Sequence, residues 1–220
     1  MKAASVKSKP RRKPAKAARD HYHHGNLRQA LIDAALALVA EGGDAAVTVR
    51  EAARRAGVSA GAPFRHFPTR AALMTAVAEE SMRRFKAEID RAIAQTSARD
   101  PLGRMRAIAR AYLRWAMRNP THFEIHSTQR LFDFDQATAL HDDDRAIRAI
   151  TRETVQAAAD AGLLRSNDVA LVQLAARALV YGFARMKIDG HFARWNVPEA
   201  EAERIGDAVV DLFIAGIAKG

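Results

Sequence analysis

Hydrophobic residues recur at intervals of three and four along most of this chain, which is the spacing of one buried face of an α-helix. The pattern predicts seven helices, over residues 27–41, 49–56, 70–93, 101–118, 142–161, 168–186 and 198–216, and two shorter helical segments, after Ser59 and after Pro120. No segment alternates hydrophobic and polar residues in the manner of a half-buried strand. We therefore expect an all-α protein of about nine helices.

The stretch from Val47 to Phe67 predicts a helix-turn-helix. Thr48 precedes the first helix with Glu51 three residues later, which is the spacing of a capping box: the Thr hydroxyl accepts from a helix amide and the Glu reaches back to the cap amide. Gly57 can adopt the left-handed conformation that ends a helix. Ser59 is then expected to cap a second, short helix.

Basic residues are concentrated at the N-terminus. The net charge is +10, and residues 1–19 hold eight Lys or Arg without one acidic residue; removing those eight from the 35 basic residues leaves 27 against 25 acidic ones. A basic segment without hydrophobic periodicity is expected to be disordered on its own. We interpret residues 1–24 as a basic arm, which either only improves solubility or follows DNA beside the helix-turn-helix.

The composition excludes several classes of protein. With 220 residues and 49% hydrophobic content, the chain can bury a sizeable core in one large or two modest domains. The absence of cysteine excludes disulfides, thiolate metal sites and cysteine nucleophiles, and a reducing cytoplasm is the simplest setting. No uninterrupted apolar run approaches the roughly 18 residues that span a bilayer, and no apolar segment follows the N-terminal basic residues. We expect a cytoplasmic protein that neither enters nor crosses a membrane.

The motif Ser59-x-Gly61-x-x-Phe64-x-His66-Phe67, followed by Pro68-Thr69-Arg70, resembles the DNA-binding domain of the tetracycline-repressor (TetR) family. The segment LIDAALALVAEGG at residues 31–43 matches the first helix of that family. The resemblance covers residues 27–80 in detail and the rest of the chain in architecture alone. It implies a helix-turn-helix DNA-binding domain at residues 25–70 and a helical effector-binding and dimerisation domain at residues 71–220.

The resemblance also assigns residues to DNA. Thr48 and Ser59 would contact phosphate through a hydroxyl or a cap amide, and Arg70 would bind phosphate at the start of the long helix. The remaining positions, at the bases, the groove or the backbone, are Arg50, Ala60, Gly61, Ala62, Phe64, Arg65 and His66. Ala60, Ala62 and Phe64 replace residues that more often carry a hydrogen-bonding group in the family. We therefore expect readout to depend on thymine methyl groups and on Arg50, Arg65 and His66, with the basic arm supplying much of the affinity.

A small-molecule effector is a further implication of the resemblance. Such a ligand would bind among the central helices and move the long helix at residues 70–93, which changes the spacing of two DNA-binding heads. The expected lining combines aromatic walls with a few polar groups: Phe85, Trp115, Arg118, Phe123, His126, Phe132, Tyr181 and Arg185. Each aromatic residue of this set could equally be an ordinary core residue.

The last two helices are expected to form a dimer interface. The helix at residues 168–186 is apolar on almost all sides and needs cover on two of them. Members of the TetR family form dimers by packing two such helices against their copies as a four-helix bundle. The predicted interface residues are Ala175, Leu179, Phe183, Ile205, Ala208, Val209, Leu212, Phe213 and Gly216. The alternative is that the two helices only close the core of their own chain.

Motifs for catalysis or metal binding are lacking in this sequence. There is no nucleophile elbow, phosphate-cradling loop, HExxH motif or paired carboxylate spacing. The three histidines of residues 21–24 and the pair His122 and His126 lack further metal ligands. We expect no enzyme, cofactor or metal, and predict a homodimer that represses transcription at operator DNA until a small molecule releases it. The alternatives are a DNA-binding dimer without an effector and a helical enzyme.

Overall fold

The structure is a computed structural model that describes residues 27–219 apart from residues 60, 129–131 and 134. The basic arm therefore lies outside the described residues. The described part of the chain is helical and contains no β-strand, and one isolated bridge joins Leu164 to Ala218. The predicted all-α class is confirmed.

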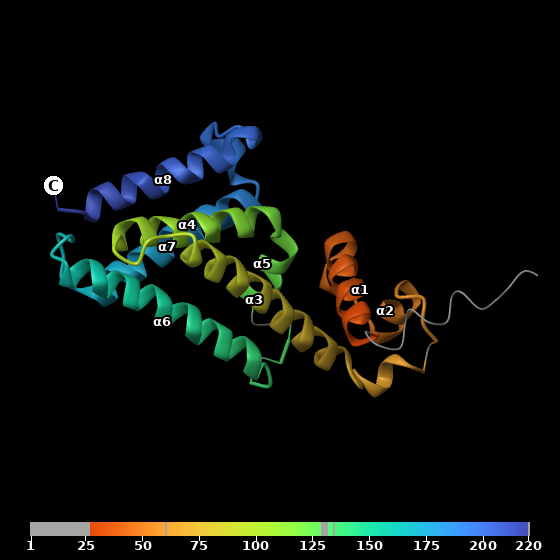
Figure 1. The fold of residues 1–220 in the computed structure, drawn as a ribbon. Coiled ribbons are helices and arrows are strands. Elements are labelled where there is room, and N and C mark those ends of the chain that lie inside the picture. Colours follow the sequence, from red (N-terminus) through yellow and green to blue (C-terminus); the bar gives the residue numbers. More distant parts are fainter. Residues whose placement is uncertain (1–26, 60, 129–131, 134, 220) are drawn as a thin grey trace, which may run out of the picture.

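Eight α-helices run through the described residues (Figure 1). They are α1 (Leu27–Gly42), α2 (Val49–Arg55), α3 (Arg70–Ala94), α4 (Pro101–Arg118), α5 (Pro120–Ser127), α6 (Thr138–Asp160), α7 (Val169–Ile188) and α8 (Ala202–Ile217). Short 3-10 helices lie at Asp44–Ala46, Pro63–Arg65, His191–Trp195 and Glu199–Glu201.

Single polar residues set the start of three helices, as the sequence predicted. The side chains of Thr69, Asp100 and Asp168 each accept a hydrogen bond from the amide three residues later, at the starts of α3, α4 and α7. Such caps satisfy amides that have no carbonyl partner within the helix. The local sequence is therefore sufficient to begin these helices.

The second helix of the predicted helix-turn-helix is a 3-10 turn and not an α-helix. Pro63–Arg65 form a 3-10 turn, η3, whose N-cap is Ala62 rather than Ser59, with no side-chain cap. An α-helix opened at Ser59 needs residue 63 to donate an amide proton to the Ser59 carbonyl, and proline has none. The Ala62 amide donates to that carbonyl instead, over 3.1 Å.

The start of α6 is a second correction. The acidic residues Asp142–Asp144 were expected to open this helix, but it begins at Thr138 with no side-chain cap. Ala137 is fully buried and Leu140 nearly so, and the Ala139 amide donates to a carboxylate oxygen of Glu79 on α3 over 3.4 Å. Packing against α3 therefore sets this boundary, and packing is invisible to a local capping rule.

One end of the molecule, called the head below, consists of α1, α2, η3 and the first turns of α3 (Figure 1). Its core includes Leu31, Ile32, Val47 and Leu73, all fully buried. The 25 residues of α3 continue without a break into the remaining helices, the body, over roughly 37 Å at 1.5 Å per residue. The head and the body thus share one helix.

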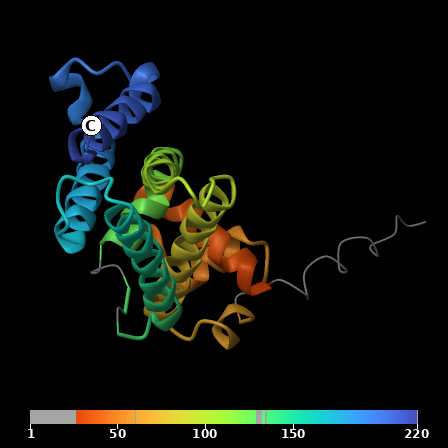
Figure 2. The same cartoon turned by 60° about the vertical axis from the view of Figure 1, so that its left-hand side comes forward.

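Figure 2 shows α7 and α8 at an outer edge of the body, with α4 and α6 on their inner side. Only Val172, Val180 and Ala184 of the 20 residues of α7 are buried. This helix is long and apolar enough to cross a bilayer by length and composition alone, and 17% of its apolar window is buried within the chain. A large apolar surface is therefore left uncovered by the chain itself.

Candidate nucleic-acid interface

The first helix of the motif is held much as its sequence predicts. The Thr48 hydroxyl accepts from the Glu51 amide over 3.0 Å, which is one half of the capping box. The other half is absent, because the Glu51 carboxylate accepts from Arg54 over 2.5 to 3.1 Å. Gly57 ends the turn after α2 with φ 70°, in the left-handed region that favours glycine. The turn therefore has a defined geometry.

The segment after this turn presents a mostly exposed surface. Pro63 and Phe67 are buried and anchor η3, while Phe64 between them is 41% exposed. Ser59, Gly61, Arg65 and His66 are exposed as well, and Ala62 is half-buried. Ala60 lies outside the described residues. The predicted DNA-facing residues of this segment are accessible on the head.

Acidic residues neutralise two arginines of α2. Hydrogen bonds from Arg54 hold the pKa of Glu51 below its usual value, and those from Arg55 do the same for Glu41. Both carboxylates therefore stay ionised and carry a charge opposite to the arginine that they bind. Arg50 is exposed on the same helix.

Arg70 has a role that the sequence did not indicate. Its Nε donates to the Val47 carbonyl over 3.0 Å, and its Nη2 donates to the carbonyl and carboxylate of Asp44 over 2.7 and 3.1 Å. The side chain thus ties the start of α3 to the segment before α2. The residue is also exposed, and its contact with phosphate stays a prediction.

The predicted effector lining is largely a packed aromatic cluster. The ring of Phe85 lies 5.2 Å from Tyr112 and 4.7 Å from Trp115, and that of Phe123 lies 5.7 Å from Tyr181, measured between centroids. Burial raises the pKa of Tyr112 against the opposing charge of Arg177, whose guanidinium lies over its ring. These aromatic residues pack as one cluster in the core, and their contact with an effector stays a prediction.

The other members of the predicted lining are also placed elsewhere or engaged. Arg118 is exposed and pairs with Glu203 of α8 at 3.0 Å. Arg185 binds Glu124 of α5 at 3.3 Å and Asp189 at 2.7 Å, so it ties α7 to α5. Phe132 is buried in the segment before α6, and the side chain of His126 lies outside the description. A cavity of about 270 Å³ is instead found between the end of α3, the start of α4 and α6.

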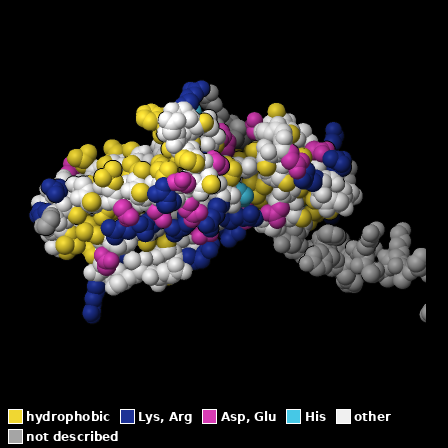
Figure 3. All heavy atoms as spheres, turned by 90° about the horizontal axis from the view of Figure 1, so that it is seen from above, with side chains coloured by type: hydrophobic (Ala, Val, Ile, Leu, Met, Phe, Trp, Pro, Cys, Tyr) yellow, Lys and Arg dark blue, Asp and Glu magenta, His cyan; other side chains and the backbone are white. Residues whose placement is uncertain are grey.

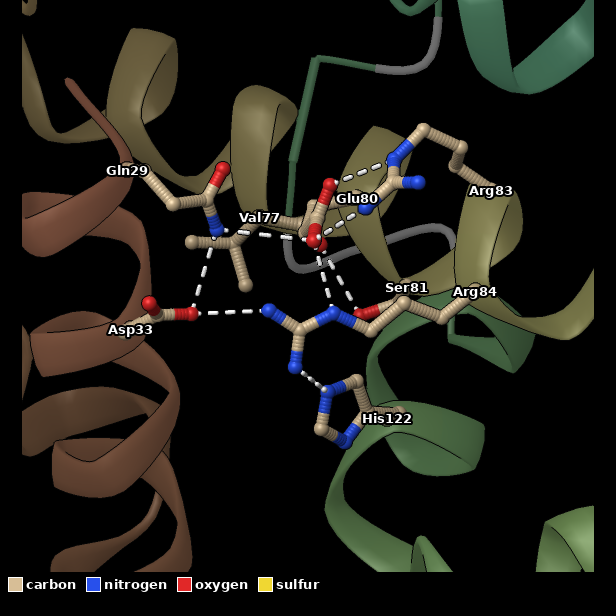
Figure 4. Close-up of polar contacts among 8 residues, drawn as sticks. All are labelled: Gln29, Asp33, Val77, Glu80, Ser81, Arg83, Arg84 and His122. Atoms are coloured by element: carbon tan, nitrogen blue, oxygen red, sulfur yellow. Dashed lines mark hydrogen bonds and ion pairs between the residues drawn. The ribbon is translucent and has the colours of Figure 1, made fainter. Parts of the chain in front are cut away.

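A polar network that the sequence pattern did not predict joins the head to the body (Figure 4). Arg84 on α3 donates to Asp33 on α1 over 2.8 Å and to Glu80 over 2.6 Å, and one of its nitrogens lies 3.4 Å from Nε2 of His122 on α5. Burial opposes ionisation of Glu80, but hydrogen bonds from Arg83 and Arg84 outweigh it and hold its pKa below the usual value. In the sequence, this network is indicated by Arg83 and Arg84, which follow Glu80 at the i+3 and i+4 positions of a helix.

Burial lowers the pKa of His122, and the nearby positive charge of Arg84 lowers it further. A neutral imidazole can accept a hydrogen bond from the guanidinium, whereas a protonated one would place a second positive charge beside it. The network thus holds α1, α3 and α5 together most tightly when His122 is neutral. Arg84 is the group that contacts all three helices.

The residues predicted for the dimer interface divide into two groups. Ala175, Ala208, Leu212 and Gly216 are exposed; Leu179, Phe183, Ile205, Val209 and Phe213 are half-buried. Phe183 also packs within its own chain. Its ring lies so close to Gly206 of α8 that a Cβ added to this glycine would be 3.1 Å from it. Leu171 and Leu174, which the prediction omitted, are 57% and 65% exposed.

Figure 3, viewed from the α8 side, shows hydrophobic side chains gathered over the body beside a band of mixed basic and acidic side chains. Ion pairs between α4 and α8 include Arg106 with Asp211 at 2.8 Å and Arg110 with Asp211 at 2.7 Å. These pairs hold α8 on α4 by one side. The apolar surface of α7 and α8 remains available to a partner.

Two family models match the chain. One, described as bacterial regulatory proteins of the tetR family, matches residues 31–77, and the other, the C-terminal domain of tetracyclin repressor-like proteins, matches residues 105–213. The HTH-type transcriptional repressor KstR of Rhodococcus jostii (strain RHA1) is 32% identical over 133 residues, which are 60% of this chain and 60% of that protein. KstR of Mycolicibacterium smegmatis is 32% identical over 51% of this chain and 53% of its own. The chain thus spans between half and two thirds of these curated relatives.

Solved structures share the fold over most of the chain. A protein of unknown function from Rhodococcus sp. RHA1 has a TM-score of 0.77 and 28% identity, covering 91% of this chain and 100% of its own. The ketosteroid transcriptional regulator KstR2 of Mycobacterium tuberculosis has a TM-score of 0.66 and 21% identity, covering 90% and 98%. The similarity extends through both the head and the body.

Proposed function

The chain belongs to the TetR family of bacterial regulatory proteins, and from this premise we propose that it is a dimeric, DNA-binding transcriptional repressor. The observation that carries the proposal is the surface beside η3. There Gly61, Phe64, Arg65 and His66 are exposed on a segment whose neighbours Pro63 and Phe67 are buried. A rigid segment that presents small, aromatic and basic groups suits the major groove. Such a repressor acts in the cytoplasm, where operator DNA is found.

Two copies are part of this proposal. Helix-turn-helix dimers bind half-sites about 34 to 36 Å apart, so the body must hold two heads at that spacing. The uncovered apolar side of α7 and α8 supports this arrangement, since a second copy would bury Leu171, Leu174 and Leu212. Residues 25–70 would then be the DNA-binding domain and residues 71–220 the dimerisation and effector domain.

The basic arm at residues 1–24 belongs to the proposed DNA interface. Contacts from its eight basic residues with phosphates would release counterions, which makes the affinity depend on salt. Deleting residues 1–19 is expected to weaken operator binding and to flatten the slope of log K against log salt concentration. An unchanged slope with unchanged affinity would show that the arm only improves solubility.

The proposal also includes a small-molecule effector that binds in the body. FadR of Bacillus subtilis, whose structure was solved with stearoyl-CoA, has a TM-score of 0.65 at 15% identity, and at that level the likeness extends to the fold alone. What supports an effector in this chain is the continuity of α3 from the body into the head, so that a shift in the body reaches the DNA-binding surface. The second candidate, a DNA-binding dimer without an effector, would use the body for dimerisation only.

A footprint on the DNA that flanks the coding region of this protein tests the function, with one protected palindromic site as the expected result. Arg65→Ala is then expected to weaken binding to that site about tenfold or more, the loss of one base or phosphate contact. Arg54→Ala is the matched control, because Arg54 already binds Glu51 and is expected to change the affinity far less. Absence of any protected site, or equal losses in both variants, would contradict the proposed interface.

A further inference from the structure

A cavity at the end of the body remote from the head has walls of two kinds. It measures about 270 Å³ and lies where the last turn of α3, the first turns of α4 and the middle of α6 meet. Ile93 and Ala94 of α3 and Ile150 and Ala157 of α6 form an apolar wall. Arg104, in the first turns of α4, brings a positive charge to the same space.

Arg104 differs from Arg106 and Arg110, the two arginines of α4 that pair with α8. Arg106 and Arg110 both bind the carboxylate of Asp211 on α8, at 2.8 and 2.7 Å respectively. The Nε of Arg104, like that of Arg110, is closed off from solvent and has no hydrogen-bond partner in the described part of the chain, but Arg104 in addition makes no ion pair there. Arg104 thus lines the cavity without a carboxylate partner, and a bound anion would supply one.

The negative charges of the acidic residues at the cavity are compensated or screened, so they do not prevent an anion from binding. Asp90 is bound by Lys86 at 2.7 Å, so its charge is already compensated. Glu153 is exposed, where water screens its charge. A carboxylate or phosphate at Arg104 would therefore meet one uncompensated acidic group, at the outer edge of the cavity.

We propose that this cavity binds a small amphiphilic anion, with Arg104 holding its carboxylate or phosphate and Ile93 and Ile150 covering its apolar part. Guanidinium groups bind both of these anions through parallel hydrogen bonds. The cavity volume of about 270 Å³ is near the lower end of the roughly 300–1,000 Å³ of small-molecule sites. The ligand is thus a short-chain acid or an alkyl phosphate rather than a large cofactor.

The regulatory consequence of this site rests on the proposed function. The cavity touches the last turn of α3, and the first turns of the same helix carry Leu73 and Met74 in the core of the head. A ligand that bound only one position of α3 would favour one position of the head. Binding itself needs neither DNA nor a dimer, so the site can be tested separately from the repressor.

Isothermal titration calorimetry of the full chain with hexanoate, hexyl phosphate and hexan-1-ol tests the site. At least one anion is expected to bind about tenfold more tightly than the alcohol, since a hydrogen bond to a charged group contributes about that factor. The anion that binds more tightly identifies the head group. Arg104→Gln is expected to abolish this preference, whereas Arg114→Gln, on the same helix but outside the cavity, is expected to preserve it.

Two further variants separate a site from a general charge effect. Ala157→Leu fills the cavity without changing any charge, and is expected to weaken all three probes. Glu153→Gln removes the opposing charge and is expected to strengthen the binding of the anions severalfold but not that of the alcohol. Circular dichroism confirms that each variant is folded.

The proposal is overturned if the alcohol binds as tightly as both anions, or if Arg104→Gln and Arg114→Gln lose the preference equally. If the anion binds as expected but the affinity for operator DNA does not change, the site stands and its regulatory role is rejected. If the footprint fails while anion binding depends on Arg104, the proposed function fails and the site stands.

Discussion

Large hydrophobic residues are fully buried in the head, whereas several on α7 and α8 are exposed. In the head, Leu31, Ile32 and Leu73 are fully buried by helices of the same chain. In α7 and α8, Leu174 is 65% and Leu212 75% exposed, although both helices are more hydrophobic on average than α3. The head is therefore complete as a folded unit, whereas α7 and α8 need cover from outside the chain.

This difference separates what a residue contributes to folding from what it contributes to assembly. Loss of a head residue should reduce stability at every protein concentration. Loss of an exposed α7 or α8 residue such as Leu174 should matter only where two chains meet, because the stability of a dimer depends on concentration. Two experiments test this contrast, beginning with the larger effect, and a third concerns the junction between the head and the body.

Leu31→Ala is expected to lower the free energy of unfolding by about 2–5 kcal/mol, because it removes methyl groups from a closed core and leaves a cavity. Urea denaturation followed by circular dichroism measures this loss, which should not change with protein concentration. Leu174→Ala is the comparison, since its effect should grow as the concentration rises. Equal, concentration-independent losses in both variants would remove the distinction between head and interface.

Leu174→Asp combined with Leu212→Asp is expected to weaken the dimer at least a hundredfold while each chain stays folded. Each change places a charge in an apolar interface, at a cost that corresponds to about tenfold or more in affinity. Sedimentation velocity reports the dimer. Ala149→Asp with Gln156→Asp, on the exposed side of α6, is the matched control and should leave the dimer unchanged. A dimer that survived the leucine changes would place the interface elsewhere.

The smallest expected effect is a pH dependence at the junction between head and body. Because the pKa of His122 is lowered by folding, the unfolded chain binds more protons, and stability falls as the pH decreases from about 6.5. This contribution is fully present above that pH and is lost progressively as the pH falls through the lower pKa of the folded protein. His122→Gln should flatten the dependence of unfolding free energy on pH in this range.

The other ionised groups around His122 are Arg84, Glu80 and Asp33. Glu80 also has a pKa below its usual value, and its contribution is lost only at pH values below about 4.5. The two effects therefore fall in different ranges. An identical pH profile between pH 5 and 7 for His122→Gln and the natural protein would exclude His122 as its cause.

Local chemistry was enough to predict most helices and the head. Thr48, Thr69, Asp100 and Asp168 cap helices through bonds to amides three residues away, so the sequence contains all the information that these boundaries need. The prediction of an α-helix after Ser59 was wrong, because Pro63 has no amide proton to donate to the Ser59 carbonyl.

The functional sites of the body depend on contacts between distant helices. Phe85, Trp115, Phe123 and Tyr181 lie in one aromatic cluster through Tyr112, with neighbouring ring centroids 4.7 to 6.2 Å apart. Aromatic composition alone cannot separate a lining from a core, since the two differ only in how closely the rings approach. The lack of an ion pair at Arg104 carries no sequence signal, because it depends on where α8 and α6 place their carboxylates.

By itself the sequence determined the all-α class, most helix boundaries, the position of the helix-turn-helix and the strongly apolar character of α7. Each of these follows from residues within a few positions of one another. The tertiary structure alone decided the start of α6, the clamp made by Arg70, the network around Arg84 and the cavity beside Arg104. Each of these joins side chains from helices far apart in the chain. Which groups meet there depends on helix packing, and no spacing along the sequence specifies it.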